Sequence, residues 1–172
     1  TFEDVVAALN QVTPHNWAAF LRSRLESLDA RAPIAGVEHS GWKLAFADEP
    51  TEYWKAREQS DKNLDVSHSI GLFLGAEGLV NDVLPASPAD KSGLIPGMRL
   101  IAVNGRKWSP EGLHQAIKDS KGSPAPLEFI TENGSFVKVF KVDYHGGERY
   151  PRLTRIEGTP DRLTESVAVK SR

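Results

Sequence analysis

The chain has 172 residues, and 21 Lys and Arg against 23 Asp and Glu leave a net charge of −2 with five neutral His. It contains no Cys, which excludes disulfide frameworks, thiolate metal sites and a cysteine nucleophile. The near-neutral balance argues against a nucleic-acid partner. The longest apolar runs, such as Gly71–Leu74, are far shorter than the roughly 20 residues of a membrane span, so no span is expected.

Residues 1–30 predict a helical segment. An apolar stripe at helical spacing after Thr1 predicts a first helix over residues 2–10, and Thr13-Pro14 predicts the start of a second over 14–28. The two stripes comprise Phe2, Val5, Val6 and Leu9, then Trp17, Phe20, Leu21, Leu25 and Leu28. Two such helices cannot bury both stripes against each other, so we expect a further surface to cover them.

Residues 31–66 predict a linker with one added strand. The first part is rich in Ala, Pro, Gly and charged residues, which is typical of a linker. Trp42, Leu44 and Phe46 then alternate with less apolar residues, which predicts a half-buried strand. The stretch 51–66 fits neither the helical nor the strand period and stays unassigned.

From Ser67 the pattern changes to short strands and two helices. Helices are expected after Ser87-Pro88 and Ser109-Pro110, where Ser is the N-cap and Pro the first helical residue. Asn133-Gly134 predicts a hairpin turn, and the polar tail after Gly147 is expected to run over the surface. The expected strands are Ser69–Leu74, Leu79–Leu84, Met98–Val103, Leu127–Thr131 and Phe136–Tyr144.

Catalytic motifs are missing from this sequence. No two of its histidines stand four residues apart, so it has no H-E-x-x-H helix that could present two imidazoles to one zinc ion. It also has no G-x-S-x-G nucleophile elbow and no phosphate-binding glycine loop. We therefore expect no catalytic residue, no metal ligand and no cofactor in this chain.

Three ordered motifs point to a binding domain instead. They are Ser69-Ile70-Gly71-Leu72; then Ser87-Pro88-Ala89 with Ser92-Gly93-Leu94 and Pro96-Gly97; then Val103-Asn104-Gly105 before a helix. Together they resemble a PDZ domain, in the arrangement found in bacterial proteases, over about residues 67–143. The resemblance implies an α+β fold: a PDZ-like, partly open β-sandwich or barrel with two helices, preceded by the N-terminal helical segment.

The same resemblance implies a peptide-binding groove. A peptide's C-terminus adds as a strand to an open sheet edge beside a helix, and successive backbone N–H groups of a tight loop hold its carboxylate. Leu72 and Ile117 would form the floor of the pocket for the last side chain, which predicts an apolar terminus. The implied carboxylate loop, pairing strand and helix face are Ser69, Ile70 and Gly71; Leu72, Phe73 and Leu74; and Pro110, His114 and Ile117.

Two positions depart from the PDZ pattern. Ser69 stands where the loop has Gly, and Met98 stands where Asp usually follows the turn glycine.

Each group of site residues has two open interpretations. The apolar residues fit a plain core as well as a core with a groove. His114 either faces a ligand or is an ordinary hydrogen-bonded side chain. His68 and Lys62, just before the loop, are either cations for a carboxylate or exposed loop residues.

A second resemblance covers nearly the whole chain. The runs Gln11–Leu21, Gly41–Leu44, Ser69–Leu72, Asp143–Leu153 and Gly158–Leu163 resemble the C-terminal third of the glycyl aminopeptidase family of zinc metallopeptidases. The most specific part is Tyr144-His145-Gly146-Gly147 with Tyr150-Pro151. The resemblance implies a catalytic zinc domain upstream of this chain and a periplasmic or secreted parent protein. A first residue other than Met fits a piece cut from such a parent.

The sequence therefore predicts four regions and one leading function. The regions are a helical segment (1–30), a linker with an extra strand (31–66), a PDZ domain (67–144) and a C-terminal extension (145–172). The leading function is a non-catalytic peptide-binding accessory module of a zinc aminopeptidase, which assists substrate access or domain assembly. Its partner would be a peptide or protein C-terminus, or its own catalytic domain. A stand-alone adaptor for C-terminal peptides and a purely structural intramolecular domain remain alternatives.

Overall fold

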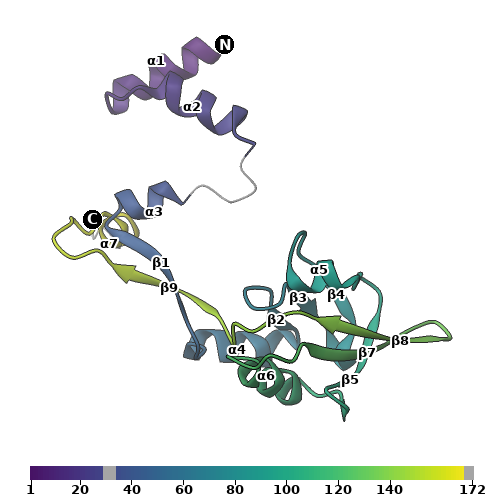
Figure 1. Ribbon diagram of the computed structural model, residues 1–172. Coiled ribbons are helices and arrows are strands. Elements are labelled where there is room, and N and C mark those ends of the chain that lie inside the picture. The colour runs from purple at the N-terminus through teal and green to yellow at the C-terminus, as the bar shows by residue number, and fades with distance from the viewer. Residues whose placement is uncertain (29–33, 169–172) are drawn as a thin grey trace. The chain divides into compact units, whose positions relative to one another are not determined.

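The computed structural model describes residues 1–28 and 34–168 and divides the chain into two units, Thr1–Gly36 and Val37–Arg172 (Figure 1). Residues 29–33, where the expected helical segment meets the expected linker, lie outside the described residues. The remainder of that linker includes a short helix, α3 (Ala35–His39), which the sequence did not predict.

The first unit contains two helices. Helix α1 spans Phe2–Val12 and begins at a Thr1 capping box, as the sequence predicts. Helix α2 spans Trp17–Glu26. It begins later than the expected start at Thr13, because the side chain of Asn16 accepts a hydrogen bond from the amide three residues on and so acts as the N-cap.

Aromatic contacts and a hydrogen bond order the turn that connects the two helices. The ring of Trp17 lies 5.0 Å from the ring of His15 and 5.8 Å from that of Phe20, both edge-on. The indole N–H of Trp17 donates to the carbonyl oxygen of Thr13 at 2.8 Å. Neither helix contains a buried residue. The expectation that the two stripes cannot be buried by this pair alone is therefore confirmed.

The second unit is built from antiparallel sheets and short helices. The sheet orders are β1-β9, β2-β3-β4 and β6-β5-β7-β8, so the described sheets are open rather than closed into a barrel. The strands are β1 (Trp42–Ala47), β2 (Leu64–Val66), β3 (Leu72–Leu74), β4 (Val80–Val83), β5 (Arg99–Val103), β6 (Arg106–Lys107), β7 (Leu127–Asn133), β8 (Phe136–Val142) and β9 (Tyr150–Arg155). The expected α+β class with open antiparallel sheets is confirmed.

The helices of this unit begin where capping residues stand. Helix α5 (Pro88–Ser92) begins at Ser87 and α6 (Pro110–Asp119) begins at Ser109, each with the serine side chain accepting from a first-turn amide. Both starts match the prediction. The other helices are α4 (Glu52–Asp61), the 3₁₀ turn η1 (Ala76–Gly78) and α7 (Arg162–Val167).

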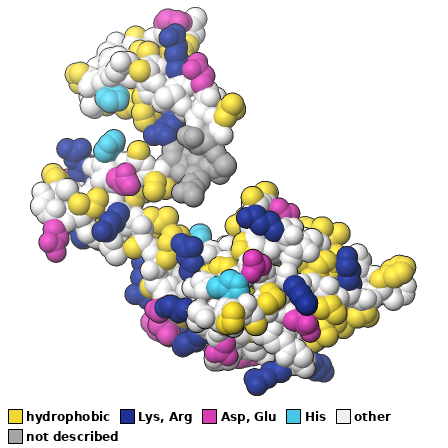
Figure 2. Space-filling view, in the orientation of Figure 1, with side chains coloured by type: hydrophobic (Ala, Val, Ile, Leu, Met, Phe, Trp, Pro, Cys, Tyr) yellow, Lys and Arg dark blue, Asp and Glu magenta, His cyan; other side chains and the backbone are white. Residues whose placement is uncertain are grey.

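One apolar core joins the two larger sheets and α6. It includes Ile70 beside the predicted loop, Phe129 on β7 and Ile117 on α6, all fully buried. Helix α6 buries the inner face that its spacing predicts, namely Leu113, Ala116 and Ile117. Exposed apolar side chains gather over the free end of the β7–β8 hairpin instead (Figure 2), where Phe136 is 78% exposed.

Two segments differ from the sequence predictions. The unassigned stretch 51–66 forms α4 and β2. The tail is not a surface coil, because β9 pairs with β1 in the ribbon visible in Figure 1 and Tyr150 is buried. Its strand was missed because Arg152, Thr154 and Arg155 interrupt the apolar residues, so the alternation that predicts a strand is weak.

The residues before β3 form a turn and not the predicted strand. Residues 67–70 turn the chain between β2 and β3, so the strand starts at Leu72 rather than at Ser69. This places the carboxylate-loop residues of the PDZ resemblance in an actual loop.

We expect Trp17→Ala to destabilise the α1–α2 pair by about 1–3 kcal/mol, because it removes two edge contacts and one hydrogen bond from a half-buried side chain. Amide hydrogen exchange in α1 and α2 of the full chain measures this loss. Val12→Ala is the matched control, since Val12 is 83% exposed. Equal exchange in the two variants would contradict the prediction.

Candidate functional site

The candidate groove lies between strand β3 and helix α6. The PDZ resemblance implies that the outer edge of Leu72–Leu74 is open, and this expectation is wrong. Strand β3 is the middle strand of its sheet, with β4 on one side and β2 on the other. Strand β2 runs antiparallel to β3, with Leu64 opposite Leu74 and Val66 opposite Leu72.

The predicted carboxylate loop holds an oxygen atom. The backbone amides of Ser69, Ile70 and Gly71 donate to the carbonyl oxygen of Val66 at N···O distances of 3.1, 3.0 and 3.2 Å. Consecutive amides that converge on one point form a site for an anion or a partially charged oxygen. The three amides of the predicted loop therefore converge on one oxygen, and this oxygen belongs to the last residue of β2.

Hydrogen bonds that the carbonyl groups of the loop accept also keep it in place. The carbonyl oxygens of Ile70 and Gly71 accept from the amides of Ala89 and Leu84, each at 2.9 Å. Gly71 has a φ of +88°, and a Cβ on it would lie 2.1 Å from the Cβ of Ser87. Only glycine fits there, both for its backbone conformation and for its lack of a side chain.

The pocket next to the loop is filled by the chain itself. The side chain of Val66 is buried in the same core cluster as Leu72 and Ile117, the two residues expected to form the pocket floor. Leu64 is buried in that cluster as well, whereas Asp65 between them is only partly buried. Burying two such side chains contributes about 1.5–3 kcal/mol each, so β2 is a favourable occupant.

The remaining predicted site residues lie around this groove. Phe73 is half-buried and lies opposite Asp65 in the strand pairing. Pro110 is exposed and lines a cavity of about 530 Å³ together with Leu64, Trp108 and residues of α4. The structure thus brings the predicted loop, strand and helix together, and this cavity lies at the end of the groove where β2 begins.

His114 contacts carboxylates, and it also lines the cavity of about 530 Å³ at the end of the groove. Its Nδ1 is hydrogen bonded to Glu148, and its Nε2 lies 3.6 Å from a carboxylate oxygen of Glu58. The hydroxyl of Tyr150 lies 3.3 Å from Nδ1. These four side chains, which we call the His114 cluster, connect α6 with α4 and with the start of β9.

Burial and charge act in opposite directions on the His114 cluster. Burial alone lowers the pKa of His114, but the hydrogen bonds that its ring makes to the Glu148 and Glu58 carboxylates outweigh burial and raise that pKa to about 9. Burial also raises the pKa of Tyr150, with a further contribution from the neighbouring Glu148 charge. The imidazole is therefore protonated at neutral pH, and its positive charge holds two carboxylates from distant segments.

The cations suggested from the sequence do not face the loop. His68 packs against the rings of Phe46 at 5.6 Å and Trp54 at 6.3 Å. Lys62 ends α4 in the left-handed conformation, with φ of 51°.

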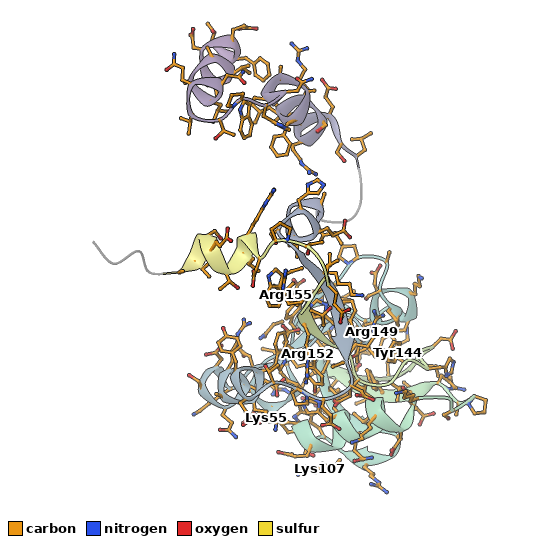
Figure 3. The ribbon with its side chains drawn as sticks, turned by 90° about the vertical axis from the view of Figure 1, so that its left-hand side faces the viewer. Lys55, Lys107, Tyr144, Arg149, Arg152 and Arg155 are labelled. Atoms are coloured by element: carbon orange, nitrogen blue, oxygen red, sulfur yellow. The ribbon has the colours of Figure 1, made fainter. Side chains whose placement is uncertain are left out.

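Arg149 is the cation that the sequence analysis missed. Its amide donates to the hydroxyl of Ser69 at 3.0 Å, and its exposed guanidinium lies 4.2 Å from the ring centroid of Phe46. Figure 3 shows it near Tyr144, and Arg152 and Arg155 follow it along β9. Its only sequence signal was its position inside the specific tail run of the aminopeptidase resemblance.

The described residues do not fit a zinc site. Within residues 1–28 and 34–168, no three His, Asp or Glu side chains are grouped so that they could hold a metal ion. In the same part of the chain, no helix is both long and apolar enough to cross a membrane. What the described groove can do is pair with an extended backbone and bind an oxygen in its loop.

Comparison with known proteins gives limited similarity. No family model matches the chain. Over 94 residues it is 31% identical to carboxyl-terminal-processing peptidase 3, chloroplastic, of Arabidopsis thaliana, a match that covers 50% of this chain and 18% of that protein. The chain thus spans less than a fifth of this curated relative. Among solved structures, it is similar to the HtrA3 PDZ domain bound to a phage-derived ligand (FGRWV), with a TM-score of 0.32, 18% identity, and coverage of 66% of this chain and 91% of that one.

The His114 cluster predicts a pH dependence of stability. Because the folded-state pKa of His114 is raised above its ordinary value of 6.5, its contribution is fully present below about pH 6.5 and is lost as the pH rises through about 9. The contribution is at most ~3 kcal/mol. Urea unfolding of the full chain between pH 6 and 9 should show this decline for the wild type, and His114→Gln should flatten it.

The control for this experiment is His145→Gln, because His145 is exposed and pairs only with the exposed Asp143 among the described residues. This variant should keep the wild-type slope. The same slope in His114→Gln and in the wild type would contradict the role given to the cluster.

Gly71→Ala should destabilise the second unit more than Gly97→Ala does. Both glycines have a positive φ, +88° and +90°, so both variants have the same backbone cost. Only the Cβ at position 71 meets Ser87, while nothing lies within 4 Å of the one at position 97. We expect a difference of about 1–3 kcal/mol from this overpacking, measured by urea unfolding. Equal losses would show that the loop relaxes freely.

Proposed function

We propose that this chain is a non-catalytic peptide-binding module of a peptidase. Its PDZ-like groove takes an extended peptide antiparallel to β3, beside α6. The terminal carboxylate binds the amides of Ser69, Ile70 and Gly71, and an apolar last side chain packs between Leu72 and Ile117. The apolar-x-apolar pattern of Leu64 and Val66 in the same place supports a ligand with this terminal pattern.

The observation that carries the proposal is the convergence of three amides on one oxygen. The three N···O distances lie between 3.0 and 3.2 Å, and the carbonyl groups of the same loop are held by Ala89 and Leu84 behind it. A carboxylate is a better acceptor for this arrangement than a neutral carbonyl, because hydrogen bonds to a charged acceptor are roughly twice as strong. The geometry thus supports recognition of a chain end.

The peptidase context rests on two similarities. One is the match over 94 residues to a C-terminal-processing peptidase. The other is the tail run from Tyr144, which resembles the glycyl aminopeptidase family. As the finer proposal, the longer protein is an aminopeptidase of that family, with zinc in a catalytic domain before Thr1 and a periplasmic or secreted location. An H-E-x-x-H helix in the coding sequence upstream would support it, and a different catalytic motif would overturn it.

A purely structural role is the second candidate function. It is favoured by one observation, namely that β2 already fills the groove and contributes two residues to the core. In this case the groove would serve only to fasten residues 51–66 to the domain, and no external chain would bind. The same experiment separates the two functions.

The test uses the variant Leu64→Ser/Val66→Ser, which removes the buried side chains of β2 and keeps the loop, β3 and α6 intact. The probe is a synthetic peptide with the sequence of residues 60–66 and a free terminal carboxylate. We expect binding to shift the NMR signals of the Ser69, Ile70 and Gly71 amides. The same peptide with a C-terminal amide should bind at least about tenfold more weakly, since it lacks the charge.

Absence of binding by this variant in a folded state would overturn the peptide-binding function and support the structural one. Equal binding of the carboxylate and amide peptides would keep β-augmentation but exclude recognition of a free C-terminus. Asp65→Ser is the matched control for the variant, because Asp65 lies in the same strand but outside the buried cluster.

A further inference from the structure

We infer that residues 51–66, comprising α4 and β2 and here called the strap, are an internal ligand that a partner's C-terminus must displace. The inference rests on the proposed function, because it concerns the regulation of the same groove. Strand β2 lies on the edge of β3 where that function places a peptide, and it runs in the same direction, with its C-terminal residue at the loop. Val66 thus imitates the last residue of a bound chain.

Contacts outside the strap also hold the binding site. The loop carbonyls are held by Ala89 and Leu84, and the other edge of β3 is paired with β4. Ile70 and Leu72 are fully buried in the core. When β2 leaves, three amides and an apolar slot become available beside a strand and loop carbonyls that keep their partners, and such pre-organisation lowers the cost of binding a second chain.

The strap itself is fastened weakly. Strand β2 has three residues, and helix α4 has no buried residue. Among the described residues, two of its buried polar atoms find no hydrogen-bond partner: the indole nitrogen of Trp54 and one carboxylate oxygen of Glu58. Each such atom lowers the stability of the docked state, because water would satisfy it in the undocked state.

Short segments join the strap to the rest of the unit at both ends. It follows β1 through residues 48–50 and precedes the loop through Ser67 and His68. Beside the backbone hydrogen bonds of β2, the ion pair that joins a strap side chain to the rest of the described unit is that of Glu58 with His114. Since the strap is tied to the domain at both ends, its local concentration at the groove is high, and it lowers the apparent affinity for any other chain.

A partner with a free C-terminus has an advantage that the strap lacks. The strap offers a neutral carbonyl to the three amides, whereas a chain end offers a full negative charge. Arg149 lies beside the loop, with its amide on the Ser69 hydroxyl, and adds a positive charge on that side. The occupant that fits is therefore a protein C-terminus with apolar last and third-last residues, the pattern of Leu64 and Val66.

A reversible lock tests the displacement, because the native chain has no Cys. Asp65 and Phe73 lie directly opposite each other in the β2–β3 pairing, where Cα atoms are about 4.5–5.5 Å apart and within reach of a disulfide. Asp65→Cys/Phe73→Cys therefore holds the strap in place when oxidised and releases it when reduced. The probe is the carboxylate peptide of residues 60–66, and its affinity is measured in both redox states.

We expect the oxidised variant to bind the peptide at least about a hundredfold more weakly than the reduced one. Wild type should bind at least about tenfold more weakly than Leu64→Ser/Val66→Ser. The disulfide control is Glu128→Cys/Lys141→Cys, an opposed pair on the β7–β8 hairpin, whose oxidation should leave binding unchanged.

The outcomes separate the inference from the proposed function. Equal affinity of the oxidised and reduced strap variants would overturn the inference and leave the peptide-binding function standing. Failure of both the reduced strap variant and the serine variant to bind would overturn the function itself. If the serine variant does not fold, the comparison of the two redox states still decides the inference.

Discussion

Three amides that share the carbonyl oxygen of Val66 organise the groove. The contact fixes the turn between β2 and β3, and with it the register that places Leu64 and Val66 in the core. A one-residue shift of β2 would move both side chains to the outer face and bring Asp65 into the core. The same contact therefore determines the loop conformation, the strand pairing and the filling of the apolar slot.

The His114 cluster is the second constraint, and it is electrostatic. A protonated imidazole between Glu58 and Glu148 joins three segments that come from different parts of the chain. Removing one carboxylate would leave the cation less compensated in a partly buried place, which is unfavourable. The cluster thus links the position of α4 to that of the C-terminal segment, so the strap and the β9 region are not independent of each other.

How far the sequence predicts this molecule depends on how strongly each segment faces the core. Helix α6 and the β7–β8 hairpin were predicted because Leu113, Ile117 and the Asn133-Gly134 turn follow clear patterns. Helix α4 was not, because it buries no residue and its inward-facing groups mix Trp54 with Glu58. The loop at Ser69–Gly71 was located from its motif. The period of apolar residues does not indicate which strand pairs with the outer edge of β3. For this reason the occupied groove could not be predicted.

The β1–β9 ribbon brings the two ends of the PDZ-like body together. Trp42 pairs with Arg155 and Ala47 with Tyr150, although the whole body lies between them in the sequence. In the unfolded chain, closing so long a loop has a large entropic cost, and a folded body shortens the loop to a few residues. Ribbon pairing is therefore favourable only after the body has folded. We therefore expect the ribbon to form after the body has folded. The pairing of β1 with β9 then depends on the body between them staying folded.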